Sequence, residues 1–182
     1  MIIGALINLV NGLLIAGIGI AMYPILKPHN SSIALWYAGF RIVEFVTHVI
    51  NVNGTLSILS LSREYAGAVA PDAVYFQTLG NSMLAYRDWD YLTYGIVFCS
   101  GALMFYYLLY RSKLVPRWIS IWGFIAVLLY LTAALLGIFG LSYQSTTFIL
   151  LVAPIALNEL TLSIWLITKG FNPSTNVSGA AK

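Results

Sequence analysis

The side chains best able to carry chemistry in this sequence are three ionisable groups inside one long apolar segment. Arg41, Glu44 and His48 are separated by three and then four positions, a spacing that places them on one face of an α-helix. An arginine binds anionic groups, a carboxyl group accepts hydrogen bonds or exchanges a proton, and a histidine titrates near neutral pH. This face is therefore the first candidate site.

A second polar pair, Asn158 and Glu159, interrupts another apolar segment near its middle. An arginine or an acid at the centre of a bilayer costs about 2.5–3.5 kcal/mol on insertion scales, so these groups are expected to meet inside a helix bundle. The least costly arrangement bonds Arg41 to Glu159 or to Glu44, with Asn158 filling the remaining hydrogen-bonding positions. Because one arginine cannot neutralise two acids, we expect one of the two carboxyl groups to be protonated.

Further charges stand where a third apolar segment begins. Arg87, Asp88 and Asp90 directly precede residues 91–110 and are expected to line the outer entrance of a polar seam. The candidate ligand-binding residues are thus Arg41, Glu44, His48, Arg87, Asp88, Asn158 and Glu159, and no catalytic residue is assigned.

The composition indicates which solvent these elements face. Of 182 residues, 60% are hydrophobic and only 8% are charged, with a mean hydropathy of +0.86, whereas a soluble domain carries roughly 25% charged residues. Five segments are long enough to cross about 30 Å of hydrocarbon, namely Ile2–Leu26, 33–61, 91–110, 118–139 and Thr146–Thr168. The sequence therefore predicts an all-α, polytopic transmembrane bundle of about five spanning helices.

The segments between the spans complete the expected organisation. Pro71 is suited to begin a short interfacial helix that ends near Leu79. Residues 1–171 are expected to form one transmembrane domain, and residues 172–182, rich in Gly, Ser, Asn and Pro, a disordered cytoplasmic tail.

Loop charges predict the orientation of the chain. With five spans, one side carries basic residues without any acid: Lys27, Arg111, Lys113, Arg117, Lys169 and Lys182. The other side mixes both signs: Arg63, Arg87, Glu64, Asp72, Asp88 and Asp90. The positive-inside rule then places the N-terminus outside and the C-terminus in the cytoplasm.

Several kinds of site are disfavoured by the residue counts. A single cysteine, Cys99, and two distant histidines are too few for a zinc or iron–sulfur site, so no metal and no cofactor is expected. The net charge of +3 comes from dispersed basic residues and does not indicate nucleic-acid binding. The expected partners are the lipid bilayer and a small polar or amphiphilic ligand, and assembly with further copies or a membrane partner is left open.

Three function classes fit these observations. The first is binding or passage of a small molecule, a lipid headgroup or a proton along the seam, with Arg41 holding a negative group. The second is a structural or regulatory membrane subunit in which the buried charges only fix helix packing. The third is a membrane-embedded enzyme that uses Glu44 or Glu159 as acid or base.

Five short motifs carry a resemblance to a known family. In order they are FRIVE at 40–44, YRDW at 86–89, YRSKLVPRW at 110–118, PIALNE at 154–159 and KGFNP at 169–173. With these motifs the chain resembles the integral membrane family called domain of unknown function 4386, over nearly its whole length. The resemblance implies a bacterial cytoplasmic-membrane protein and supplies no catalytic residue or cofactor. It also implies a further hydrophobic span before Ile2–Leu26 in many relatives, whereas Met1 here leads directly into that segment.

Overall fold

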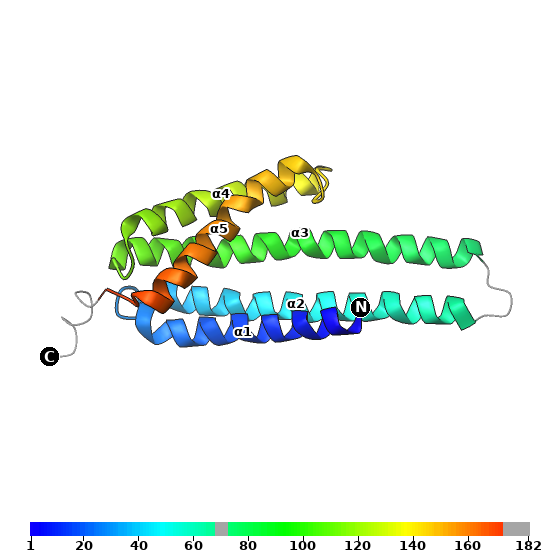
Figure 1. Ribbon diagram of the computed structural model, residues 1–182, viewed down its shortest axis with the longest axis horizontal. Helices are drawn as coiled ribbons and strands as arrows, with labels where there is room; N and C mark the ends of the chain where they lie inside the picture. The colour runs from blue at the N-terminus through cyan, green and yellow to red at the C-terminus, as the bar shows by residue number, and fades with distance from the viewer. Residues whose placement is uncertain (68–72, 173–182) are drawn as a thin grey trace.

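The computed structural model describes residues 1–67 and 73–172, and the regular structure in these ranges is entirely helical (Figure 1). Its helices are α1 (Ile2–Leu26), α2 (Ser31–Gly67), α3 (Ala73–Ser112), α4 (Arg117–Ile138) and α5 (Thr146–Thr168). Each is long and apolar enough to cross a membrane. The predicted all-α fold with five membrane-spanning helices is therefore confirmed.

The helices pack mainly on their neighbours in sequence. The extensive contacts join α1 to α2, α2 to α3, α3 to α4, and α4 to α5. Figure 1 shows α1 and α2 on one side of α3 and α4 on the other, with α5 crossing α4 obliquely. Because α5 packs on α4 and has little contact with α1, the bundle does not close into a ring.

Two helices are much longer than a membrane span requires. α2 has 37 residues and α3 has 40, so at 1.5 Å per residue they measure about 55 and 60 Å. Their joined ends extend beyond the other helices as a two-helix hairpin (Figure 1). Within this hairpin the rings of Tyr65 and Phe76 lie 5.3 Å apart.

The expected short interfacial helix is not a separate element. Its described part, from Ala73 onward, forms the first turns of α3, while Pro71 lies outside the described residues. Hydroxyl groups in this part of α3 bond to their own helix: the hydroxyl of Thr78 donates to the carbonyl of Val74 at 2.8 Å, and that of Ser82 donates to the carbonyl of Thr78 at 3.0 Å. The predicted tail beyond residue 172 also lies outside the described residues.

Two glycines of α1 determine how closely α2 approaches. A Cβ atom added to Gly12 would lie 2.8 Å from the Cβ of His48, and one added to Gly19 would lie 2.6 Å from the Cβ of Arg41. The glycines and their partners are both seven residues apart, as two antiparallel helices in close contact require. The small residues of α1 thus allow α2 to bury its polar face against α1.

Candidate functional site

The centre of the polar face of α2 is an ion pair. The Nη1 atom of Arg41 lies 2.7 Å from Oε2 of Glu44, and the two side chains are only 13% and 2% exposed. The Arg41 guanidinium also lies 5.8 Å from the centre of the Tyr37 ring, within cation–π range. Of the two partners expected for Arg41, the structure selects Glu44, one turn away on the same helix.

The second oxygen of Glu44 is bound from α3. The hydroxyl of Tyr94 donates to Oε1 of Glu44 at 3.2 Å, so this buried carboxylate accepts one hydrogen bond from α2 and one from α3. Tyr94 is absent from the predicted binding residues. Tyr94 follows Asp90 by four residues, which places both side chains on one face of the helix. This spacing could have identified Tyr94 from the sequence.

His48 joins α1 to this cluster. Its Nδ1 atom lies 3.0 Å from the backbone oxygen of Glu44, and its Nε2 atom lies 3.2 Å from Nδ2 of Asn11. An amide nitrogen only donates, so Nε2 accepts and Nδ1 carries the proton that it donates to Glu44. These contacts hold the imidazole of His48 between α1 and α2.

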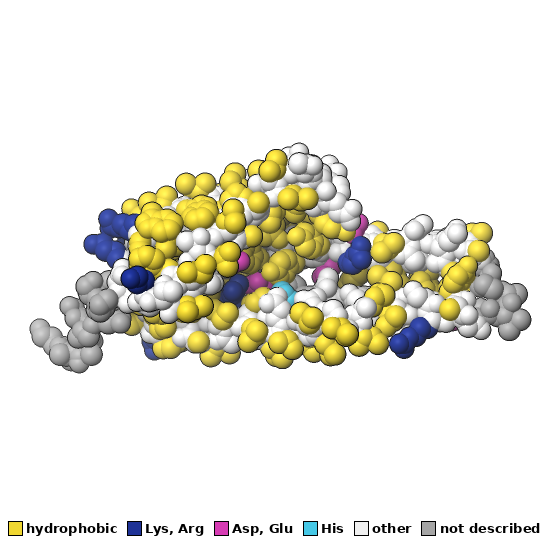
Figure 2. Space-filling model, in the orientation of Figure 1, with side chains coloured by type: hydrophobic (Ala, Val, Ile, Leu, Met, Phe, Trp, Pro, Cys, Tyr) yellow, Lys and Arg dark blue, Asp and Glu magenta, His cyan; other side chains and the backbone are white. Residues whose placement is uncertain are grey.

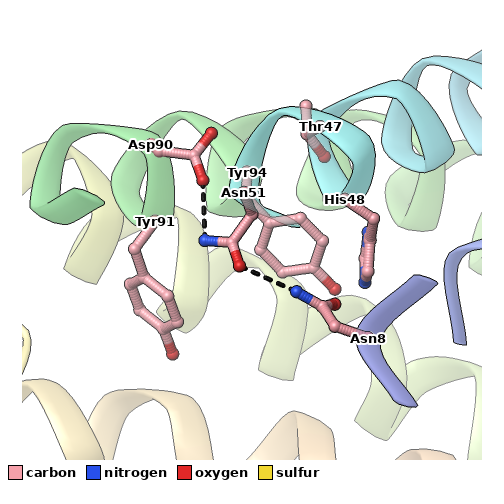
Figure 3. A pocket seen from close by; sticks show the side chains of 7 residues that line it. All are labelled: Asn8, Thr47, His48, Asn51, Asp90, Tyr91 and Tyr94. Atoms are coloured by element: carbon pink, nitrogen blue, oxygen red, sulfur yellow. Dashed lines mark hydrogen bonds between the residues drawn. The ribbon is translucent and has the colours of Figure 1, made fainter. Parts of the chain in front are cut away.

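A second polar cluster lies one to two turns further along α2, toward its C-terminal end (Figure 3). The side chain of Asn8 donates to Asn51 at 2.7 Å, and Asn51 donates to Asp90 at 2.8 Å, which links α1, α2 and α3. These residues line a pocket of about 250 Å³ whose wall also includes His48 and Tyr94. We call it the outer pocket.

A larger cavity lies deeper in the bundle. It has a volume of about 580 Å³, is bounded by α1, α2, α3 and α5, and has Arg41, Glu44, Tyr94 and Glu159 among its polar lining. We call it the α1–α5 cleft. Tyr94 lines both this cleft and the outer pocket, so its side chain forms part of the wall between them.

The cleft opens through the side of the bundle, between the helices. Figure 2, viewed across the helix axes, shows a hollow between the layer of α4 and α5 and the layer of α1 and α2, with basic, acidic and histidine side chains visible in it. Most of the remaining lining is apolar or aromatic, for example Ile15, Phe98 and Leu162, and Asn11 and Ser163 add an amide and a hydroxyl group.

Glu159 faces the cleft from α5 and is exposed to it. Within the part of the chain that the structure describes, its carboxyl group forms no hydrogen bond and no ion pair, since the cation of the cleft, Arg41, is bonded to Glu44. The cleft therefore presents one arginine, one carboxylate that is paired with it, and one carboxyl group without a bonded cation.

Asn158 occupies a different environment from the one expected. It is fully buried, and its Nδ2 atom donates to the backbone oxygen of Ile119 in α4 at 3.0 Å. Successive residues of a helix point about 100° apart, so Glu159 faces the cleft while Asn158 faces α4. The prediction that Asn158 completes the hydrogen bonding of Arg41 is therefore wrong.

The three charges at the start of the third span also separate. Asp90 lines the outer pocket, but neither Arg87 nor Asp88 does. Arg87 is exposed and lies 3.5 Å from the hydroxyl of Tyr143 in the α4–α5 turn. Neighbouring positions on a helix face different directions, so of these three residues Asp90 faces α1 and α2.

The described residues contain no group of three or more histidine, cysteine, aspartate or glutamate side chains that could hold a metal ion. Cys99 is a buried thiol whose Sγ lies 3.7 Å from the backbone oxygen of Val127. The cleft lining supplies ionic, aromatic and hydrogen-bonding groups.

Comparison with known proteins gives one result. No curated protein and no solved structure matches the chain. The model of one family, described as Domain of unknown function (DUF4386), matches residues 1–170. The expected resemblance is thereby confirmed, and this multi-pass membrane protein with an Arg41–Glu44 pair at its centre belongs to that family.

Proposed function

We propose that the protein binds a small amphiphilic molecule in the α1–α5 cleft and that this ligand enters from the bilayer. The observation that carries the proposal is a cavity of about 580 Å³ that holds charged groups and opens through the side of a bundle whose helices are long and apolar enough to span a membrane. Ligand sites typically measure about 300–1,000 Å³ and combine a mostly apolar lining with a few placed polar groups. The cleft has both properties.

The charges of the cleft favour a ligand with a cationic group. Arg41 is already bonded to Glu44, whereas Glu159 has no bonded cation among the described residues. Aromatic rings such as that of Phe105 stabilise organic cations further, and apolar side chains such as Leu162 suit a hydrocarbon chain. This assignment replaces the sequence-based expectation that Arg41 holds a negative group of the ligand.

A purely structural role explains these charges less well. An ion pair that sets the register between helices joins two helices, but Arg41 and Glu44 belong to the same one. Replacing a buried pair by apolar residues is often neutral or stabilising, so packing alone gives little reason for it. Glu159 is harder still to explain by packing, because within the described residues its carboxyl group forms no hydrogen bond or ion pair to another helix.

The test measures thermal unfolding of the detergent-purified protein with a matched series of amphiphiles. Dodecyltrimethylammonium is expected to raise the unfolding temperature more than dodecylphosphocholine does, and a neutral dodecyl maltoside serves as the reference. Glu159→Gln is expected to abolish this preference for the cation. Glu64→Gln is the charge-matched control, since Glu64 lies on the exposed hairpin, and it should retain the preference.

Two outcomes would contradict the proposal. One is an equal response of the wild-type protein to cationic and neutral amphiphiles. The other is an equal loss in the Glu159→Gln and Glu64→Gln variants, which would mean that the total charge of the protein, not the cleft, governs binding.

We also propose that the chain lies in a bacterial cytoplasmic membrane with its N-terminus outside and its C-terminus inside. The support is that the α1–α2 turn, the α3–α4 turn and the C-terminal end of α5 lie at the same end of the bundle (Figure 1), where the loop basic residues are concentrated. Cysteine labelling tests it in a Cys99→Ala background. A membrane-impermeant maleimide should label Gln144→Cys in intact cells and Lys113→Cys only after permeabilisation, and the reverse pattern would refute the orientation.

A further inference from the structure

A second, separate groove lies between α3 and α4, toward the end of the bundle that carries the basic turns. It has a volume of about 300 Å³, and its wall is almost entirely apolar and aromatic, with Tyr106, Tyr107, Tyr110, Ile121, Phe124 and Ile125 in it. The groove is therefore suited to a hydrocarbon chain. It shares Tyr106 with the α1–α5 cleft but includes neither Glu44 nor Glu159, so the proposal made here does not rest on the function proposed for the cleft.

Two arginines stand at the end of this groove, held by aromatic rings. The guanidinium of Arg111, which lines the groove, lies 5.9 Å from the centre of the Tyr107 ring, and its Nη1 atom is 3.3 Å from the Tyr107 hydroxyl. The guanidinium of Arg117 lies 5.2 Å from the centre of the Tyr110 ring. Both side chains are exposed, so their remaining hydrogen-bond donors stay available.

These arginines have no acidic neighbour to neutralise them. The sequence contains no aspartate or glutamate between Asp90 and Glu159. The pair of Arg41 and Glu44 is the only ion pair within the described ranges, so neither Arg111 nor Arg117 is paired with an acid there. Lys113 adds a third positive charge to the same turn. An anionic group that binds here meets only positive charge.

Ser120 supplies a polar group inside the otherwise apolar groove. Its side chain lines the groove and is 1% exposed, and its Oγ atom has no hydrogen-bond partner among the described residues. A buried hydroxyl without a partner costs roughly as much as a lost hydrogen bond. A ligand with an ester oxygen at that depth would accept a hydrogen bond from it.

We propose that the α3–α4 groove is a binding site for an anionic phospholipid. One acyl chain lies against Phe124 and Ile125, the hydroxyl of Ser120 donates to an ester oxygen, and the guanidinium groups of Arg111 and Arg117 bind the phosphate, as arginine does through its planar array of donors. A lipid fits better than free phosphate because the groove is apolar and lies within a membrane span.

The depth of the site agrees with that of a lipid headgroup. Trp118 is 52% exposed beside Arg117 and stacks on Trp122 with ring centres 6.3 Å apart. Exposed tryptophans at the ends of spans mark the membrane–water interface. The arginines thus lie at the level of the phosphates and the groove extends toward the level of the acyl chains.

The experiment is native mass spectrometry of the protein released from nanodiscs that contain phosphatidylglycerol and phosphatidylcholine in equal amounts. The wild type should retain phosphatidylglycerol in preference to phosphatidylcholine. Each arginine near anionic lipid contributes about 1 kcal/mol, or about fivefold in affinity. Arg111→Gln with Arg117→Gln should therefore reduce the preference about 25-fold.

Two further variants test whether a loss of lipid preference comes from the groove itself, rather than from the total charge of the protein or from misfolding. Lys27→Gln with Lys169→Gln removes the same charge from exposed positions outside the groove and should keep the preference. Ile121→Trp fills the groove without changing any charge and should reduce retention of the lipid, with helix content checked by circular dichroism. Equal preference in the wild type and the double arginine variant would overturn the proposal, as would an equal loss in both double variants.

Discussion

Gly19 of α1 lies directly against Arg41 of α2, with room for a hydrogen atom but not for a side chain. A larger residue must move either the helix or the arginine, so Gly19→Leu is expected to lower the free energy of unfolding by about 1–3 kcal/mol. Gly17→Leu is the control, because no atom lies within 4 Å of a Cβ added at Gly17. Denaturant unfolding in detergent measures both, and an equal loss in the two variants would contradict the close contact.

The pair of Arg41 and Glu44 should show strong energetic coupling. Arg41→Gln leaves a buried carboxylate without its cation, which is expected to cost about 3–5 kcal/mol. The double variant Arg41→Gln with Glu44→Gln removes both charges and should lose much less. The same unfolding measurement completes the double-mutant cycle, and strictly additive losses would show that the two side chains do not depend on each other.

Tyr94 should stabilise the protein through Glu44. Tyr94→Phe removes the donor to Oε1 of Glu44, and an unsatisfied buried acceptor costs about 1–3 kcal/mol. Tyr86→Phe makes the same chemical change at an exposed position of the same helix and should have little effect. If the two variants unfold alike, the hydrogen bond between Tyr94 and Glu44 contributes nothing to stability.

Asn158 should be dispensable for ligand binding although it adjoins Glu159. Asn158→Leu removes one hydrogen bond to α4 and also a buried Oδ1 atom that has no partner in the described ranges. The two effects oppose each other, so stability should change by less than about 1 kcal/mol, and the response to cationic amphiphiles should persist. If Asn158→Leu folds normally but loses that response, Asn158 contributes to ligand binding and the prediction is wrong.

The five spans could be predicted because they depend only on the length and hydropathy of the segments. The ends of α2 and α3 could not, since hydropathy marks where helices leave the membrane rather than where they stop. At positions such as Thr78 and Ser82, hydroxyl groups bond to the preceding turn, so polar residues continue the helix. The expected separate interfacial helix was wrong for this reason.

The candidate site could be predicted in part. Helical spacing correctly placed Arg41, Glu44 and His48 on one face, because it fixes direction around the helix axis. It could not choose between Glu44 and Glu159 as the partner of Arg41, since that choice depends on how α5 packs. Nor could it tell which of Asn158 and Glu159 faces the cleft, because the two neighbours differ only by a rotation about α5.

Photolabelling in a bilayer tests most directly whether the cleft binds a cationic amphiphile. A long-chain trimethylammonium compound with a photoreactive group in its chain is cross-linked to the protein, and labelled peptides are mapped by mass spectrometry. Labels should concentrate on cleft residues of α1 and α5 such as Ile15 and Leu162, and they should be lost in Glu159→Gln. Labels spread evenly over the lipid-facing sides of all helices, in the wild type and the variant alike, would contradict a ligand site in the cleft.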